Sequence, residues 1–167
     1  MDFRKHAIAA IVVLSAAPAL AQSPEGIAQY KDWGVYVAST GSSKVCFALS
    51  KPKDSKPDGV KRGDIYVFVT SRPGENVTNE VTIEIGYPFK DGGRAQAKIG
   101  DASFSLYTKG EKAWVENAAE EPGMVGAMRA GSEMIVTGTS QRGTNTTDTY
   151  SLQGITDALN RVASECK

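Results

Sequence analysis

The sequence predicts a mainly β protein, an antiparallel β-sandwich with a short helix near 120–130 and a C-terminal helix. Many short segments in which apolar and polar residues alternate follow one another, separated by turns rich in glycine, proline and asparagine. The last segment instead carries apolar residues at helical spacing. Short strands at such close spacing are typical of a sandwich, and the final helical period indicates one helix added to it.

The first residues have the features of an export signal. The 167-residue chain begins "MDFRKHAIAAIVVLSAAPALAQ": a positive stretch precedes an apolar run, and Ala19-Leu20-Ala21 fits the small-x-small rule for cleavage. We therefore expect residues 1–21 to be a signal peptide, 22–31 to be a flexible N-terminus, and 32–167 to be a single β-sandwich domain. No internal repeat and no linker divides that domain.

Nine segments are expected to form strands. "TGSS" is a hairpin turn between the first two, the charged stretch Lys51–Gly63 is a loop, and "RPGEN" and Gly86–Gly93 are turns. The segment "DIYVFVTS" is apolar on both faces, as in a central strand, whereas "VTIEI" alternates cleanly. The expected strands are Trp33–Ser39, Lys44–Ser50, Asp64–Ser71, Val81–Ile85, Ala95–Ile99, Ala102–Thr108, Lys112–Glu116, Ser132–Gly138 and Thr147–Leu152.

Two segments are expected to be helical. Glu120–Gly131 begins with acidic residues and Pro122 and ends in a glycine suited to a C-terminal cap. Its internal glycines, Gly123 and Gly126, weaken that helix. The last segment, "GITDALNRVASEC", is an amphipathic helix with an apolar stripe.

The same periods place the two cysteines. Ile155, Leu159 and Val162 step by four and three residues, and Cys166 continues their stripe, so it faces whatever the helix packs on. In "KVCFALS", Cys46 lies on the face opposite the larger residues Val45, Phe47 and Leu49. If those larger residues fill the core, a helix lying over the other face brings the thiols together. We predict a Cys46–Cys166 disulfide, the usual state of a cysteine pair in an oxidising compartment.

Composition excludes several functional classes. The chain has 19 basic and 19 acidic residues, and loss of Asp2, Arg4 and Lys5 with the leader lowers the net charge from 0 to −1, so a nucleic-acid partner is not expected. The only histidine, His6, leaves with the leader. Ser-His and Cys-His nucleophile pairs and histidine-ligated zinc are then excluded, and no cofactor or metal is expected. We also expect a monomer, with no transmembrane segment after signal cleavage.

Catalytic motifs are absent or incomplete. Ser50–Lys53 formally matches S-x-x-K, but Pro52 interrupts it in a loop and its partner motifs are missing. Asp64, Glu84 and Asp148 are carboxylates that would have to meet in a cleft for acid–base work. A small periplasmic enzyme or enzyme inhibitor on a β-sandwich scaffold therefore stays as the alternative to a non-enzymatic binding protein.

Two groups of residues are candidates for binding a partner. The first is a basic loop, which can meet an acidic partner or simply be solvated; it contains Lys51, Lys53, Lys56, Lys61 and Arg62. The second is an aromatic and arginine cluster of hot-spot composition, formed by Arg72, Tyr87, Phe89 and Arg142. The alternative for Tyr87 and Phe89 is that they plug one end of the core beneath the proline turn.

Several long segments resemble the invasion-associated locus B family of alphaproteobacterial exported proteins. They are "RGDIYVFVTSRP", "GYPF" and "AMRAGSEMIVTGTSQRGTNTTDTYSLQGITDAL", together with Trp33 and Cys166, and the likeness covers nearly all of the chain after the leader. The resemblance implies an Ig-like β-sandwich with helical additions. It also implies a protein of the periplasm or outer membrane, in a family whose founding members are linked to entry into host cells. The family has no known catalytic residues, so the resemblance implies no catalytic site. It also implies a binding partner in the envelope or on a host surface.

Overall fold

The computed structural model describes residues 23–40 and 43–167 of the chain, and the predicted signal peptide lies outside them. Besides the two α-helices, α1 (Glu121–Ala130) and α2 (Ile155–Glu165), two 3-10 turns occupy Pro73–Glu75 and Ala118–Glu120. The strands are β1 (Glu25–Tyr30), β2 (Trp33–Thr40), β3 (Ser43–Ser50), β4 (Asp54–Lys56), β5 (Tyr66–Arg72), β6 (Val77–Glu84), β7 (Arg94–Ile99), β8 (Ala102–Lys109), β9 (Lys112–Val115), β10 (Glu133–Thr139) and β11 (Asn145–Ser151).

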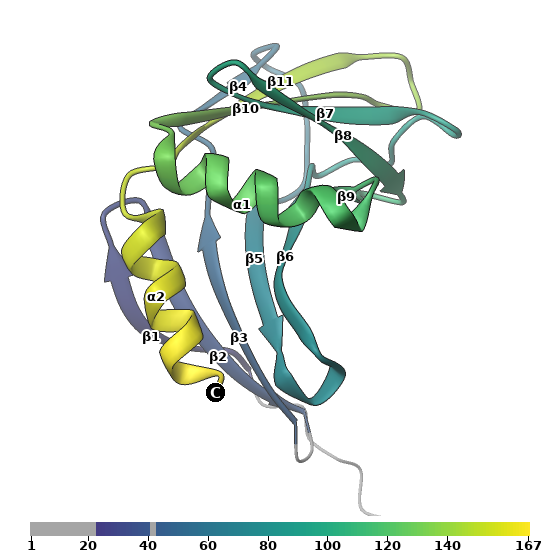
Figure 1. Ribbon diagram of the computed structural model, residues 1–167. Coiled ribbons are helices and arrows are strands. Elements are labelled where there is room, and N and C mark those ends of the chain that lie inside the picture. The colour runs from purple at the N-terminus through teal and green to yellow at the C-terminus, as the bar shows by residue number, and fades with distance from the viewer. Residues whose placement is uncertain (1–22, 41–42) are drawn as a thin grey trace, which may run out of the picture.

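The eleven described strands form one antiparallel sheet in the order β1-β2-β3-β5-β6-β9-β8-β7-β10-β11-β4. The sheet bends into two layers: Figure 1 shows β1, β2, β3, β5 and β6 in the lower part, and β7, β8, β10, β11 and β4 above them. The predicted mainly β, antiparallel fold with two helices is confirmed. Its two layers are joined by a continuous hydrogen-bonded ladder.

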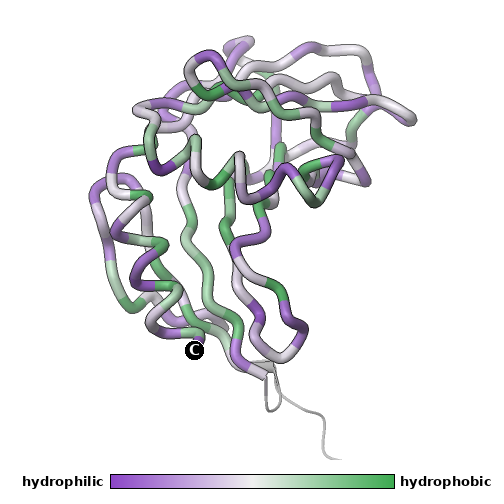
Figure 2. The backbone as a smooth tube through the Cα atoms, viewed as in Figure 1, coloured by the Kyte–Doolittle hydropathy of each residue, from purple (hydrophilic) through white to green (hydrophobic). Residues whose placement is uncertain are grey.

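The helices lie on the inner side of the bend. Helix α2 packs on β1, β2, β3 and β5, while α1 runs between the two layers and packs on β6 and the start of α2 (Figure 1). The fully buried core lies between the helices and the inner faces of the strands, and Figure 2 shows hydrophobic stretches along the central strands of the lower layer. Trp33 is fully buried there, and its indole nitrogen donates to the Ser151 carbonyl across the core, 3.0 Å away.

The predicted disulfide is confirmed. Cys46 on β3 and Cys166 after α2 are bonded, with their Cα atoms 5.9 Å apart. Ile155, Leu159 and Val162 of the predicted stripe are buried against the sheet. The adjacent Lys44 ammonium donates to the Glu165 carboxylate and carbonyl, at 2.7 and 2.8 Å, which holds the same end of the helix.

The premise behind that disulfide was wrong, because the core lies on the side of Cys46. Cys46 and Ala48 are fully buried, whereas Val45, Phe47 and Leu49 are half-exposed on the opposite face. Cys46 and Ala48 are therefore the residues of β3 that face helix α2. The larger residues of β3 therefore lie on a face that no described helix covers.

Two segments expected to lack regular structure contain strands. The stretch predicted as a flexible N-terminus forms β1, which pairs with β2 through a register that shifts between Gly26 and Ala28. The loop Lys51–Gly63 contains β4, which pairs with β11 at the other edge of the sheet. Each of these strands is stabilised by main-chain hydrogen bonds to a neighbouring strand. Such bonds do not depend on side-chain type, so neither strand shows an alternation of apolar and polar residues in the sequence. Within the described part of the chain, neither helix has the length and apolar character needed to span a bilayer.

Candidate functional site

The predicted basic loop does not form one positively charged patch. Lys53 pairs with Asp32, and the Lys56 ammonium lies 3.0 Å from the Asp58 carboxylate. Lys51 instead lies over the Tyr66 ring, 5.1 Å from its centroid. Lys61 is exposed. Because nearby carboxylates neutralise much of the loop charge, an anionic partner gains little from it.

The fifth basic residue of the loop, Arg62, is buried rather than exposed. Its guanidinium donates to both Asp148 carboxylate oxygens, at 2.7 and 2.6 Å, and to the Ile85 carbonyl, while lying 5.1 Å from the Tyr87 ring centroid. Only 7% of the Arg62 side chain and none of the Asp148 side chain is exposed. This bidentate pair ties the loop to β11 inside the core, so assigning Arg62 to a partner-binding surface was wrong.

The proposed aromatic and arginine cluster is not assembled either. Tyr87 and Phe89 are each only 6% exposed, and the Tyr87 hydroxyl lies 2.6 Å from the Thr146 hydroxyl. These rings plug the core, as the alternative held, and burial raises the pKa of the Tyr87 phenol. Arg72 ends β5 and pairs with glutamates there, whereas Arg142 is exposed in the turn between β10 and β11.

The three carboxylates of the enzyme alternative lie in different settings. Asp148 is in the buried pair with Arg62, Glu84 faces the Lys112 ammonium on the surface, and Asp64 is exposed before β5. Among the described residues, no group of three or more acidic, cysteine or histidine side chains is placed to hold a metal ion.

Sequence reasoning missed a row of aromatic side chains on the outer face of the bent sheet, opposite the helices. We call this row the outer aromatic face; it consists of Tyr36, Phe47, Tyr66, Phe68, Tyr107 and Trp114. The rings of Tyr36 and Phe47, cross-strand partners, stack with centroids 5.3 Å apart, and Phe68 continues the row 5.9 Å from Phe47. The signal was present in the sequence, since these residues alternate with the buried residues of their own strands.

The row continues across the bend of the sheet. Thr82 of β6 pairs with Phe68 on one side and with Trp114 on the other, and Trp114 stacks on Tyr107, with centroids 6.3 Å apart. Tyr107 is 51% exposed, the largest exposure of a bulky hydrophobic side chain in the described residues. A hollow of about 320 Å³ lies between Phe47, Phe68 and Trp114.

Ion pairs surround this face. The Arg72 guanidinium lies 3.0 Å from the Glu80 carboxylate, and this hydrogen bond raises the pKa of Arg72. Lys112 and Glu84 face each other across β9 and β6, at 3.7 Å. Each of these cations has a carboxylate partner on a neighbouring strand. Lys51 adds a third cation over the Tyr66 ring, and Arg72 also pairs with a second carboxylate, that of Glu75. The rim therefore carries three cations and three carboxylates around an aromatic centre.

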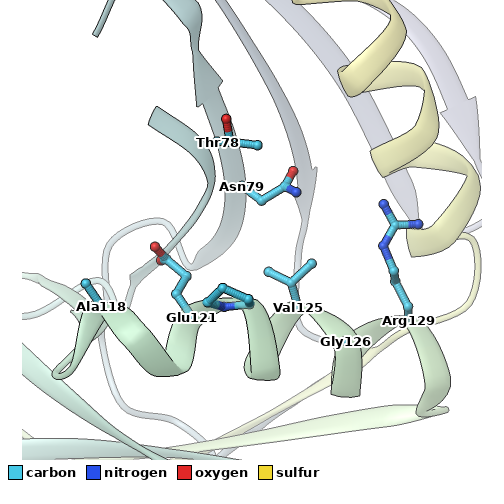
Figure 3. A pocket seen from close by; sticks show the side chains of 8 residues that line it. Thr78, Asn79, Ala118, Glu121, Val125, Gly126 and Arg129 are labelled. Atoms are coloured by element: carbon cyan, nitrogen blue, oxygen red, sulfur yellow. The ribbon is translucent and has the colours of Figure 1, made fainter. Parts of the chain in front are cut away.

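A second concave site lies beside α1. Strand β9 pairs with β6 only at Thr82–Glu84, so the earlier half of that edge of β6 is left to α1. Between them is a groove of about 520 Å³, which Figure 3 shows with its lining side chains. It is lined by Thr78, Asn79, Ala118, Glu121, Pro122, Val125, Gly126 and Arg129.

Three of these residues, Glu121, Val125 and Arg129, follow one another at four-residue spacing on α1 and so share one helix face (Figure 3). One Glu121 carboxylate oxygen accepts a hydrogen bond from the Val81 backbone N–H, at 2.8 Å. Burial, reinforced by the nearby Glu80 charge, raises the pKa of Glu121. A carboxyl group with a raised pKa in a concave site is a frequent mark of a functional residue.

The family assignment agrees with this architecture. The family model described as "Invasion associated locus B (IalB) protein" matches residues 33–163. The chain belongs to the invasion associated locus B family. The match runs from Trp33 at the start of β2 nearly to the end of α2, so it includes every strand of the sheet except β1, helix α1, most of α2, and the groove. None of the curated proteins and none of the solved structures compared with the chain matches it.

Proposed function

We propose that this member of the invasion associated locus B family is an exported, non-enzymatic protein of the periplasm or outer membrane. It binds a protein partner in the envelope or on a host surface through the outer aromatic face. The observation that carries the proposal is a row of stacked, half-exposed aromatic rings on a sheet face that no described helix covers. Such rings, surrounded by polar side chains, have the composition of a protein–protein hot spot.

The charges favour a protein over an anionic polymer or lipid surface. Around the aromatic rings, the cations Arg72, Lys112 and Lys51 are balanced by three carboxylates, which leaves no excess positive charge to attract phosphate groups. The hollow between Phe47 and Trp114 can accept an apolar side chain from a partner, while the rim pairs supply hydrogen bonds at its edge.

Two further features support export of the protein and a rigid binding surface. The leader-like start of the chain and the disulfide fit an oxidising compartment, and the disulfide holds α2 against the strands whose outer side carries the aromatic rings. A platform whose geometry is fixed in advance loses less conformational entropy on binding.

Site-specific cross-linking in intact cells tests the proposal. A photo-reactive amino acid at position 107, at the exposed end of the row, should cross-link a protein, whereas the same group at position 142 should not. The cross-link at 107 should disappear in a Phe47→Thr/Trp114→Thr double variant, because threonine keeps the strand propensity and removes the rings. Circular dichroism of that variant checks that it is folded.

Several outcomes would count against this function. Equal cross-linking from 107 and 142, or a cross-link at 107 unaffected by the double variant, means that the aromatic rings do not select a partner. A cross-link from position 107 to a glycan or a lipid, and not to a protein, would show that the partner is not a protein. A pull-down from envelope extracts, compared between the parent protein and the double variant, gives an independent measurement.

A further inference from the structure

The groove beside α1 carries opposite charges at its two ends. Glu121 lies in the first turn of α1 and Arg129 in the last, with Val125 and the open position of Gly126 between them (Figure 3). Pro122 adds apolar surface to the same lining. Arg129 lies eight positions after Glu121 on the helix, which places their Cα atoms about 12 Å apart. The volume of about 520 Å³ lies within the range of small-ligand sites.

Each charged side chain is held in place through one group while others stay available. For Glu121, one carboxylate oxygen accepts from Val81, and the second has no hydrogen-bond partner among the described residues. One Arg129 nitrogen donates to the Thr156 carbonyl and the Asn160 amide oxygen of α2, at 3.3 and 3.1 Å. Its other guanidinium nitrogens make no hydrogen bond within the described part of the chain. Both charges are therefore positioned before any ligand arrives.

We infer that this groove binds a short free peptide of three or four residues, with its ammonium at Glu121 and its carboxylate at Arg129. An extended chain spans about 3.3–3.6 Å per residue, so three or four residues cover roughly 10–14 Å, which matches the separation of the Glu121 and Arg129 Cα atoms. A carboxylate is the ligand that a guanidinium binds best, through paired hydrogen bonds. Asn79, on the β6 side of the groove, supplies an amide that can hydrogen-bond to peptide groups.

The apolar floor limits which peptides fit. Val125 is buried beneath the groove, and a Cβ atom added at Gly126 would meet no atom within 4 Å. The peptide therefore lies over a smooth helix surface that accepts small side chains. This site goes beyond the proposed function, because none of its lining residues belongs to the outer aromatic face or its hollow.

Calorimetric titration of the purified protein with tetra-alanine tests the inference, with the N-acetylated and C-amidated forms as paired probes. Blocking either terminus should weaken binding at least about tenfold, as expected for a lost hydrogen bond between charged groups. Glu121→Gln should weaken tetra-alanine by a similar factor and leave the N-acetylated peptide unaffected. Arg129→Gln should also weaken the binding of tetra-alanine about tenfold and leave the binding of the C-amidated peptide unchanged.

A pair of glycine variants separates occupancy of the groove from general effects on the helix. Gly126→Leu places a side chain in the groove and should abolish binding, whereas Gly123→Leu, on the same helix but outside the lining, should not. Both replace a helical glycine with a better helix former, so both should fold. No saturable binding of tetra-alanine up to about 10 mM, equal binding of the blocked peptides, or equal effects of both leucine variants would each overturn the inference.

Discussion

Loss of the Cys46–Cys166 disulfide is expected to remove a large share of the free energy of unfolding. The perturbation is a Cys46→Ala/Cys166→Ala double variant, and alanine is chosen because Cys46 is fully buried under α2 and a polar replacement would be unsatisfied there. Reduction of the parent protein should produce the same change without any substitution.

The size of the effect follows from the length of chain that the bond closes. The two cysteines are 120 positions apart, for which the chain-entropy model gives about 5 kcal/mol at 25 °C. Measured effects are commonly smaller, so a loss of about 3–5 kcal/mol is expected. Total stabilities of domains are about 5–15 kcal/mol, so this loss is a substantial fraction of the total.

Urea unfolding followed by tryptophan fluorescence measures this loss, because Trp33 is fully buried in the native state. The midpoint should fall, and the dependence on urea should steepen because an unlinked unfolded chain exposes more surface. Reductant should have no effect on the double variant, which controls for reagent effects. A loss of less than about 1 kcal/mol would refute the reasoning and show that packing of α2 alone holds the C-terminal segment.

Three further substitutions test other parts of the structure. Asp148→Asn should cost about 3–5 kcal/mol in urea unfolding, because Arg62 stays buried without its countercharge; a loss within about 0.5 kcal/mol would contradict this. The pKa of Glu121 is raised in the fold, so its ionisation disfavours folding as pH rises through that range, and Glu121→Gln should gain melting temperature relative to the parent near pH 7 but not near pH 4. An equal difference at both pH values would contradict that sign. Gly154→Ala should cost about 2 kcal/mol or more, because the residue has φ +94 and its Cβ would lie 2.0 Å from the Tyr30 carbonyl oxygen; unchanged thermal unfolding would show that this turn relaxes easily.

The sequence alone was enough for most of the local structure. The pattern of apolar residues identified the strands from Trp33 onward except β4, with boundaries displaced by a few residues, and the helical period of Ile155, Leu159 and Val162 identified α2. The same period placed Cys166 on the buried side and so gave the correct disulfide. These properties depend on neighbours only a few positions apart, which is why they can be read from the chain itself.

The candidate sites depended on contacts that sequence does not display. Tyr87 and Phe89 have a hot-spot composition, and only packing shows that they plug the core. Arg62 lies in a charged loop, yet it is buried because Asp148, 86 positions later, meets it. The outer aromatic face was predictable in principle, but it required knowing which side of β3 faces the core.

What the sequence by itself determined was the period of each element, the class of fold and the pairing of the two cysteines. Only the tertiary structure decided which face of β3 and β5 helix α2 covers, and therefore that Phe47 and Phe68 are left on the outer face. It also decided that β9 stops short along β6 and leaves α1 to line a groove there. The physical reason is that alternation fixes two faces of a strand equally well, and only packing against the rest of the chain selects the buried one.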